Sequence, residues 1–256
     1  MNIINRFVCN CRMNKPIHVG IKKPVYHPRI KNFYNETFNS DYPFHLNIVA
    51  APKGSGKTSL LKMYCNEYIK QGGKALYLSH PIGDYDNFIS NFIRGPFLPG
   101  RCLAEYLPKK SVIVLDHIDG HYDDVNTLNS NEIANLRILL LILMHEIPLY
   151  GNFNVVAVAS NPNLVREMLK LNNYCKIELF FDPILHKWES HHLQPIVDSI
   201  FHDKDPLQKK EITKLASIAG TPGFLNQIEI SEEKALQIQD EWNDFSYENL
   251  FDYTNK

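Results

Sequence analysis

The middle of the chain alternates short apolar segments with longer amphipathic ones. Five segments are short and apolar, and we expect them to form β-strands: residues 45–50, 74–79, 111–115, 154–160 and 176–181. The segments with apolar residues at helical spacing are 57–70, 131–146 and 164–171, with a shorter one at 87–93. Strands that alternate with helices predict a parallel sheet covered on both faces. The expected fold class is therefore α/β, with five parallel strands.

The same pattern divides the chain into three regions. Residues 1–40 are expected to form an irregular basic leader, because three prolines interrupt any long helix. Residues 41–187 contain the alternating strands and helices. From His191 onward the pattern is helical only. We therefore expect residues 188–256 to form a small helical unit that ends in an acidic tail.

Charge is distributed unevenly in a chain whose formal net charge is only −1. The leader has no acidic residue before position 32 and seven basic ones: Arg6, Arg12, Lys15, Lys22, Lys23, Arg29 and Lys31. From Glu229 to Asp252 there are eight acidic residues against Lys234 alone. A basic arm can neutralise the phosphates of DNA. The alternative interpretation of the leader is a solvated, partly disordered N-terminus.

Cysteine usage and hydropathy limit the compartment. Five cysteines without regular spacing give no disulfide framework, which indicates a reducing compartment such as cytoplasm or nucleus. The acid-free leader is also compatible with a mitochondrial presequence. The longest apolar run, 138–144, is too short to span a bilayer, so no membrane association is expected.

The segment between the first strand and the first helix has the pattern of a phosphate-binding P-loop. Glycines let backbone N–H groups turn toward a phosphate, and the following helix adds the positive end of its dipole. We expect Lys57 to reach the β- and γ-phosphates of ATP and the Thr58 hydroxyl to bind Mg²⁺. Alanine replaces the usual first glycine. The predicted ATP-binding residues are Ala51, Pro52, Lys53, Gly54, Ser55, Gly56, Lys57, Thr58 and Ser59.

An aspartate follows the strand at 111–115. Asp116 at the tip of a buried strand is expected to hold magnesium, the Walker B role, although a loop aspartate is the ordinary alternative. His117 stands where related ATPases place the glutamate that activates water, and Asp119 could orient water or metal instead. Each of the last two could equally be an edge or turn residue.

Asn161 directly follows the strand at 154–160. An amide at this position can orient the attacking water, the sensor role. The same residue precedes Pro162 at the start of a helix, so a helix N-cap is the alternative, and the two roles are compatible.

The order of these motifs resembles a known family. The sequences GSGKTSLL at 54–61, LDHID at 115–119 and SN at 160–161 look like those of AAA+ ATPases, most of all origin-recognition subunits and archaeal initiators. The sequence AGTPGFL at 219–225 is similar to the G-x-P segment in the lid of those initiators and of STAND ATPases. The resemblance covers roughly residues 42–228. It implies a five-stranded αβα core with a small helical lid, and ATP-dependent assembly, often around DNA.

Two departures from the family bear on catalysis. His117 replaces the glutamate, which predicts slow hydrolysis with binding retained. Only Lys176 lies near the place of the family's arginine, and lysine lacks the planar fork of arginine.

The sequence thus predicts an AAA+-like ATPase that binds ATP with Mg²⁺ and acts as an assembly switch in DNA metabolism, as an oligomer or hetero-oligomer. A RecA-like repair or viral genome-packaging ATPase is an alternative, although the second strand lacks the terminal carboxylate of the RecA form. A small-molecule kinase would need a basic lid, and this C-terminus is acidic. A non-catalytic ATP-binding scaffold is the remaining alternative.

Overall fold

A computed structural model describes residues 44–79, 111–116, 153–169, 177–179, 188–227 and 229–251. The leader at 1–40 and the helices expected at 87–93 and 131–146 lie outside these described residues. No helix in the described ranges is long and apolar enough to cross a membrane.

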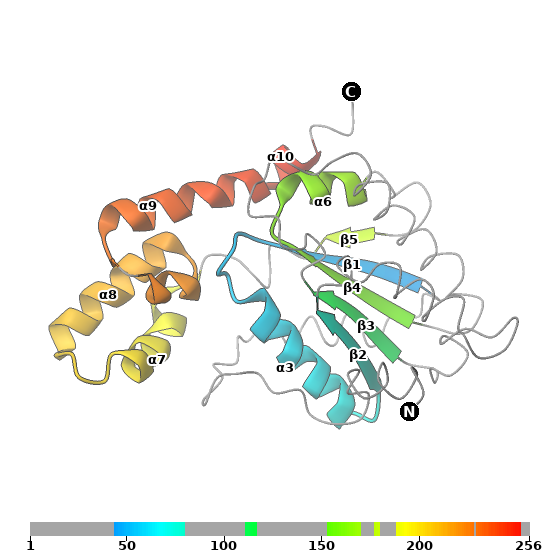
Figure 1. Cartoon of the computed structure of the whole chain (residues 1–256), viewed down its shortest axis with the longest axis horizontal. Helices are drawn as coiled ribbons and strands as arrows, with labels where there is room; N and C mark the ends of the chain where they lie inside the picture. Colours follow the sequence, from blue (N-terminus) through cyan, green and yellow to red (C-terminus); the bar gives the residue numbers. More distant parts are fainter. Residues whose placement is uncertain are drawn as a thin grey trace, which may run out of the picture.

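The centre of the fold is a parallel β-sheet (Figure 1). Its strands are β1 (Phe44–Ala50), β2 (Lys74–Ser79), β3 (Ser111–Asp116), β4 (Phe153–Ala159) and β5 (Ile177–Leu179). They lie in the order β2-β3-β4-β1-β5, and each neighbouring pair is parallel. The observed strands end within two residues of the segments expected from the sequence.

The strand β3 is buried on both faces. Four consecutive residues, 112–115, are fully buried, and all four are Val, Ile or Leu. A continuous apolar run is typical of a strand with a layer on either side, because successive side chains point to opposite faces.

Two helices in the described ranges pack on the sheet. Helix α3 (Lys57–Lys70) contacts β2 and β3 and buries an apolar stripe that includes Leu61, Tyr64 and Tyr68. Gly72, in the left-handed conformation, then ends the turn after the helix. Helix α6 (Pro162–Leu169) contacts β1 and β4.

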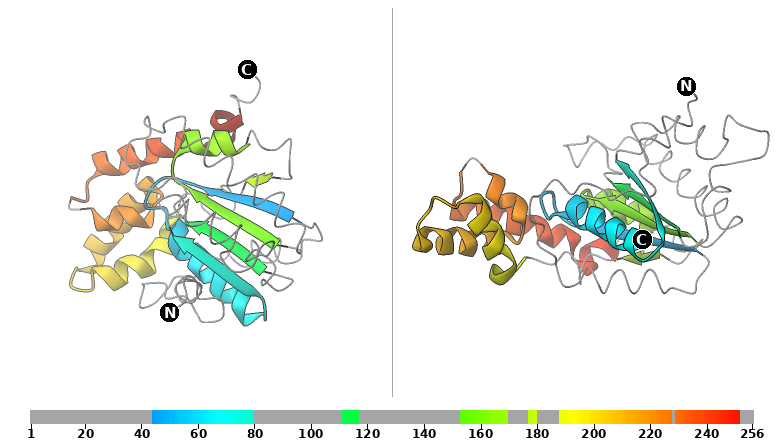
Figure 2. Two further views of the ribbon diagram at one scale, coloured as in Figure 1. Left: turned by 45° about the vertical axis from the view of Figure 1, so that its right-hand side comes forward. Right: turned by 90° about the horizontal axis from the view of Figure 1, so that it is seen from below.

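The C-terminal part of the described chain is helical, as expected. Its elements are α7 (Ser190–Ile200), α8 (Pro206–Ala219), η5 (Pro222–Asn226), α9 (Glu232–Glu241), η6 (Trp242–Phe245) and α10 (Tyr247–Phe251). Helices α7, α8 and α9 lie beyond the carboxyl ends of the strands, whereas α10 lies beside α6 (Figures 1 and 2). We refer to residues 188–251 as the C-terminal helical region.

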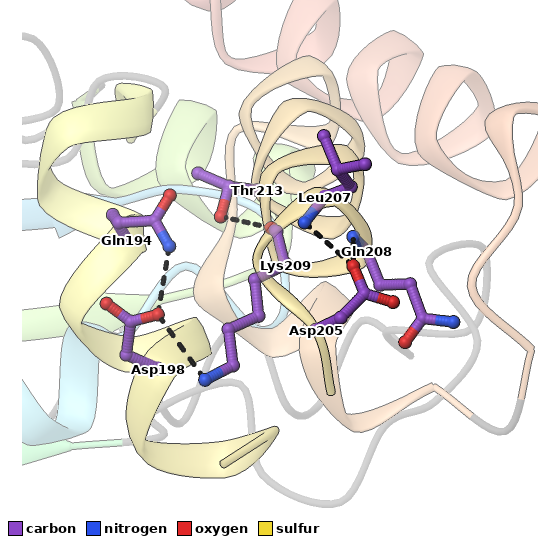
Figure 3. Close-up of polar contacts among 7 residues, drawn as sticks. All are labelled: Gln194, Asp198, Asp205, Leu207, Gln208, Lys209 and Thr213. Carbon is purple, nitrogen blue, oxygen red and sulfur yellow. Dashed lines mark hydrogen bonds and ion pairs between the residues drawn. The ribbon is translucent and has the colours of Figure 1, made fainter. Parts of the chain in front are cut away.

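Polar side chains fix the corner between α7 and α8 (Figure 3). Asp205 is the N-cap of α8, and its carboxylate accepts hydrogen bonds from the backbone N–H groups of Leu207 and Gln208, at 2.8 and 3.0 Å. Asp198 on α7 lies 4.0 Å from the Lys209 ammonium on α8. The Asp205 cap defines where α8 begins, and the Asp198–Lys209 pair is a surface contact between α7 and α8.

One hydrophobic cluster joins the sheet to the C-terminal helical region. It contains residues of α3 and the central strands, and it continues through Trp188 to Leu193, Val197 and Phe224. The helices beyond the strand ends therefore share a core with the sheet rather than standing apart from it.

Candidate functional site

Three polar features meet along the carboxyl edge of the sheet. The 51–58 loop follows β1, Asp116 ends β3, and Asn161 follows β4. These three strands are consecutive neighbours, with β4 in the middle. Because the strands are parallel, their carboxyl ends share one edge, and the crevice outside that edge is the usual ligand site of such sheets.

The loop's backbone is shaped by two glycines. Gly54 and Gly56 have φ angles of 83° and 90°, a left-handed conformation that side chains rarely adopt. Gly56 is also the N-cap of α3, so the loop leads straight into the helix N-terminus. Together these features make the turn and the dipole end that an anion site requires.

Lys57, the first residue of α3, is buried against the preceding turn of this loop, with only 6% of its surface exposed. Its ammonium donates hydrogen bonds to the carbonyl oxygens of Ala51 at 2.6 Å and Pro52 at 2.8 Å, and to the Ser55 hydroxyl at 3.4 Å. These acceptors hold a positive charge inside the concave side of the loop. Ala51, in place of the usual glycine, is fully buried and still presents its carbonyl to Lys57.

Asp116 is fully buried at the end of β3. The Tyr77 hydroxyl, from β2, donates a hydrogen bond to its carboxylate. Burial, the Asp116 charge and this hydrogen bond raise the pKa of Tyr77. Burial, and then the Asp116 charge, likewise raise the pKa of Cys65 on α3. Tyr77 and Cys65 therefore stay protonated around a buried carboxylate.

The sequence pattern alone does not indicate a role for Tyr77. It pairs with Val114 across the parallel ladder, and Asp116 lies two residues farther along on the same face. Only the register of β2 on β3 brings Tyr77 to Asp116, and hydrophobic periodicity does not predict that register.

Thr58 and Ser59 are half-buried in the first turn of α3, and Lys53 is exposed on the loop. His117 and Asp119 lie outside the described residues, so their predicted roles stay predictions.

Asn161 caps a helix, which is one of the two roles expected of it. Its side-chain oxygen accepts hydrogen bonds from the backbone N–H groups of Asn163 at 2.9 Å and Leu164 at 3.4 Å, which caps α6. The residue is 4% exposed, and its amide nitrogen, Nδ2, has no hydrogen-bond partner within the described part of the chain. A buried amide with an unused donor has a cost, and such groups often mark a ligand site.

The C-terminal helical region touches the loop directly. The Trp188 indole N–H donates to the Ser55 carbonyl at 2.9 Å, and the Gly223 N–H donates to the Gly54 carbonyl at 2.9 Å. A Cβ on Gly223 would lie only 2.5 Å from the Gly54 Cα, so the two backbones approach too closely for any larger residue. Trp188 carried no signal in the sequence, because only the fold brings it to the loop.

Glu241, at the end of α9, has a shifted pKa. Burial and the neighbouring Asp244 charge raise the pKa of Glu241, while the positive charge of Lys57 lowers it.

No protein-family model and no curated protein sequence matches the chain. Among solved structures, it is similar to the ORC2 protein of Aeropyrum pernix, with 14% identity, a TM-score of 0.49, and coverage of 91% of this chain and 73% of that one. A RuvB variant of Thermotoga maritima has 14% identity and a TM-score of 0.44, covering 84% and 69%. The Walker-type ATPase paby2304 of Pyrococcus abyssi has 14% identity and a TM-score of 0.41, covering 93% and 81%. This similarity is distant, and the function proposed below rests on the chain's own residues.

Proposed function

We propose that the protein is a P-loop ATPase that binds ATP with Mg²⁺ at the carboxyl edge of its sheet. The observation that carries the proposal is the 51–58 loop: two glycines with positive φ, a helix N-terminus and a buried lysine ammonium lie within eight residues. All three features favour a phosphate group, by backbone N–H donors, helix dipole and charge.

The residues around the loop fit a nucleotide with its metal. Lys57 would neutralise the β- and γ-phosphates, while the Thr58 hydroxyl and the Asp116 carboxylate would hold Mg²⁺. Bound magnesium would neutralise phosphate charge during hydrolysis. Tyr77 orients Asp116 through its hydrogen bond to the carboxylate. A metal-binding carboxylate is commonly held in this way by a neighbouring donor.

Asn161 would hold the attacking water. Its Nδ2 is a buried donor at the end of β4, the strand between the Asp116 strand and the P-loop strand. Because Oδ1 caps α6, the amide plane is fixed with Nδ2 on the side away from the helix backbone. His117, at the position of the family's glutamate, favours slow turnover, and Asp119 is the other candidate for orienting water.

The wider role in this proposal is that of an AAA+-like assembly switch in DNA metabolism. The motif order along 54–225 and the basic leader support it. In this role the C-terminal helical region would act as the lid over the nucleotide, and the protein would assemble as an oligomer or hetero-oligomer when ATP is bound.

Replacing Lys57 tests the ATP site. Lys57→Ala removes the ammonium from the loop, and we expect ATP affinity measured by calorimetry to fall at least about tenfold, or about 1.4 kcal/mol. Lys70→Ala is the matched control, because Lys70 lies exposed in the last turn of the same helix. A circular dichroism melt verifies that both variants remain folded. Equal ATP affinity in the parent and Lys57→Ala would contradict the P-loop assignment.

A further inference from the structure

The C-terminal helical region holds two successive peptide groups of the 51–58 loop. The Gly54 carbonyl accepts from the Gly223 N–H, and the Ser55 carbonyl accepts from the Trp188 indole, both at 2.9 Å. In a planar trans peptide, the carbonyl and the next residue's N–H point in opposite directions. The Gly56 N–H therefore points away from Trp188, and the Ser55 N–H points away from Gly223.

Two other carbonyls of the loop are held from within the loop. Those of Ala51 and Pro52 accept from the Lys57 ammonium, inside the loop. The loop thus has an inner set of carbonyls held by Lys57 and an outer set held by the helical region. Rotation of either outer peptide would turn a carbonyl, with its partial negative charge, toward the phosphate-binding side.

Trp188 is itself held firmly. Its side chain is 4% exposed, and its backbone N–H donates to the Gly220 carbonyl at 3.0 Å. The ring meets the His192 ring edge-on, at 6.4 Å between centroids and 86° between planes. The ring also lies beside Gly56, where an added Cβ would be 3.5 Å from the indole. The indole N–H is therefore a donor whose position is fixed by the helical region.

We propose that Trp188 is a positioning residue for the phosphate-binding loop: its indole N–H, together with the Gly223 N–H, fixes the loop peptides in the orientation that binds phosphate. The coupling is reciprocal, so occupancy of the loop changes the environment of Trp188. The expected effect on ATP affinity rests on the proposed function, but the positioning of the loop by Trp188 can be measured without nucleotide.

The first measurement is amide hydrogen exchange across residues 53–60 without nucleotide. Trp188→Phe keeps an aromatic ring but removes the donor, and we expect these amides to exchange at least about fivefold faster than in the parent. Trp242→Phe is the matched control, because the Trp242 indole donates to the Ala219 carbonyl at 3.1 Å within the helical region itself. Unchanged exchange in Trp188→Phe would overturn the inference, whether or not the protein binds ATP.

The second measurement is ATP affinity in the same proteins. We expect Trp188→Phe to weaken ATP binding by about three- to tenfold, corresponding to about 0.7 to 1.4 kcal/mol, and Trp242→Phe to leave ATP affinity unchanged. If the parent binds no ATP, the proposed function fails, and the exchange experiment alone decides the positioning role. If the parent binds ATP and Trp188→Phe binds it equally well, the positioning role fails while the proposed function stands.

A third measurement leaves Trp188 in place, in case Trp188→Phe does not fold. The chain has two tryptophans, so Trp242→Phe leaves Trp188 as the only tryptophan, which is excited selectively at wavelengths that the 13 tyrosines do not absorb. We expect saturating ATP to change the emission of Trp188 and to reduce its quenching by acrylamide. Emission and quenching that stay constant while calorimetry shows ATP bound would overturn the inference.

Discussion

Buried charge is the most informative feature at the residue scale. The Lys57 ammonium and the Asp116 carboxylate are both buried, and each is stabilised by hydrogen bonds, Lys57 by loop carbonyls and Asp116 by Tyr77. An unpaired charge in the interior is costly, and ionisable groups held in this way cluster at functional sites. The sequence predicted both charged residues from motif spacing. It could not predict Tyr77, because that contact depends on strand register.

Asp116→Asn tests the metal role at this scale. The amide keeps the shape of the side chain but removes the negative charge that would hold Mg²⁺. We expect magnesium-dependent ATP turnover to fall at least about tenfold, or about 1.4 kcal/mol of barrier. Asp198→Asn, at an exposed carboxylate of α7, is the control. Should the parent turn over too slowly to measure, the difference in ATP affinity with and without magnesium replaces the rate. A magnesium effect of the same size in Asp116→Asn and the parent would contradict the assignment.

At the scale of elements, the strands and α3 follow from local pattern, whereas the packing between elements does not. The 57–70 helix and the 74–79 strand have the bounds that periodicity predicts. The P-loop glycines precede the helix, and Gly72 and Gly73 separate the helix from the strand. The contact between α3 and β3 that buries Cys65 beside Asp116 is different. Periodicity gives the buried face of a helix, but not which residue of the neighbouring strand lies opposite.

The pH dependence of stability tests this packing. Because the pKa of Cys65 is raised in the folded state, the unfolded chain loses the thiol proton first, and its contribution to stability is lost as pH rises above the ordinary thiol value of about 8.5. We expect the parent to lose about 1.4 kcal/mol relative to Cys65→Ala between pH 7 and pH 9.5, measured by urea unfolding. Tyr77 is present in both proteins, so its titration largely cancels. A stability difference that does not change with pH would mean that Cys65 titrates alike in both states.

At the scale of the whole molecule, the sheet and the C-terminal helices share one hydrophobic cluster, and the candidate site lies where they meet. The sequence predicted a helical C-terminal unit and, by resemblance, a lid that includes residues 219–225. The close approach of Gly223 to Gly54 could not be predicted, because it joins positions more than 160 residues apart. The charge asymmetry between the basic leader and the acidic tail is likewise a property of the whole chain.

Deleting residues 1–31 tests the predicted DNA partner. The deletion removes seven basic residues and no acidic one, so we expect weaker binding to duplex DNA and a shallower fall of affinity with salt. ATP affinity should not change, because the site lies in later residues. Fluorescence anisotropy with labelled DNA at several salt concentrations measures both the DNA affinity and its dependence on salt. Equal DNA affinity with and without the leader, or no binding by the parent at low salt, would remove the leader from the DNA-binding role.

The central claim, that ATP binds at the 51–58 loop, is tested most directly by NMR of protein labelled with ¹⁵N-glycine. The chain has 12 glycines, and Gly54 and Gly56 can be assigned by single substitutions. We predict that ATP with Mg²⁺ shifts the amide resonances of Gly54 and Gly56 in a saturable manner, and that Lys57→Ala abolishes these shifts at the same ATP concentrations. Resonances of Gly54 and Gly56 that stay in place at saturating ATP, while other glycines shift, would contradict the claim.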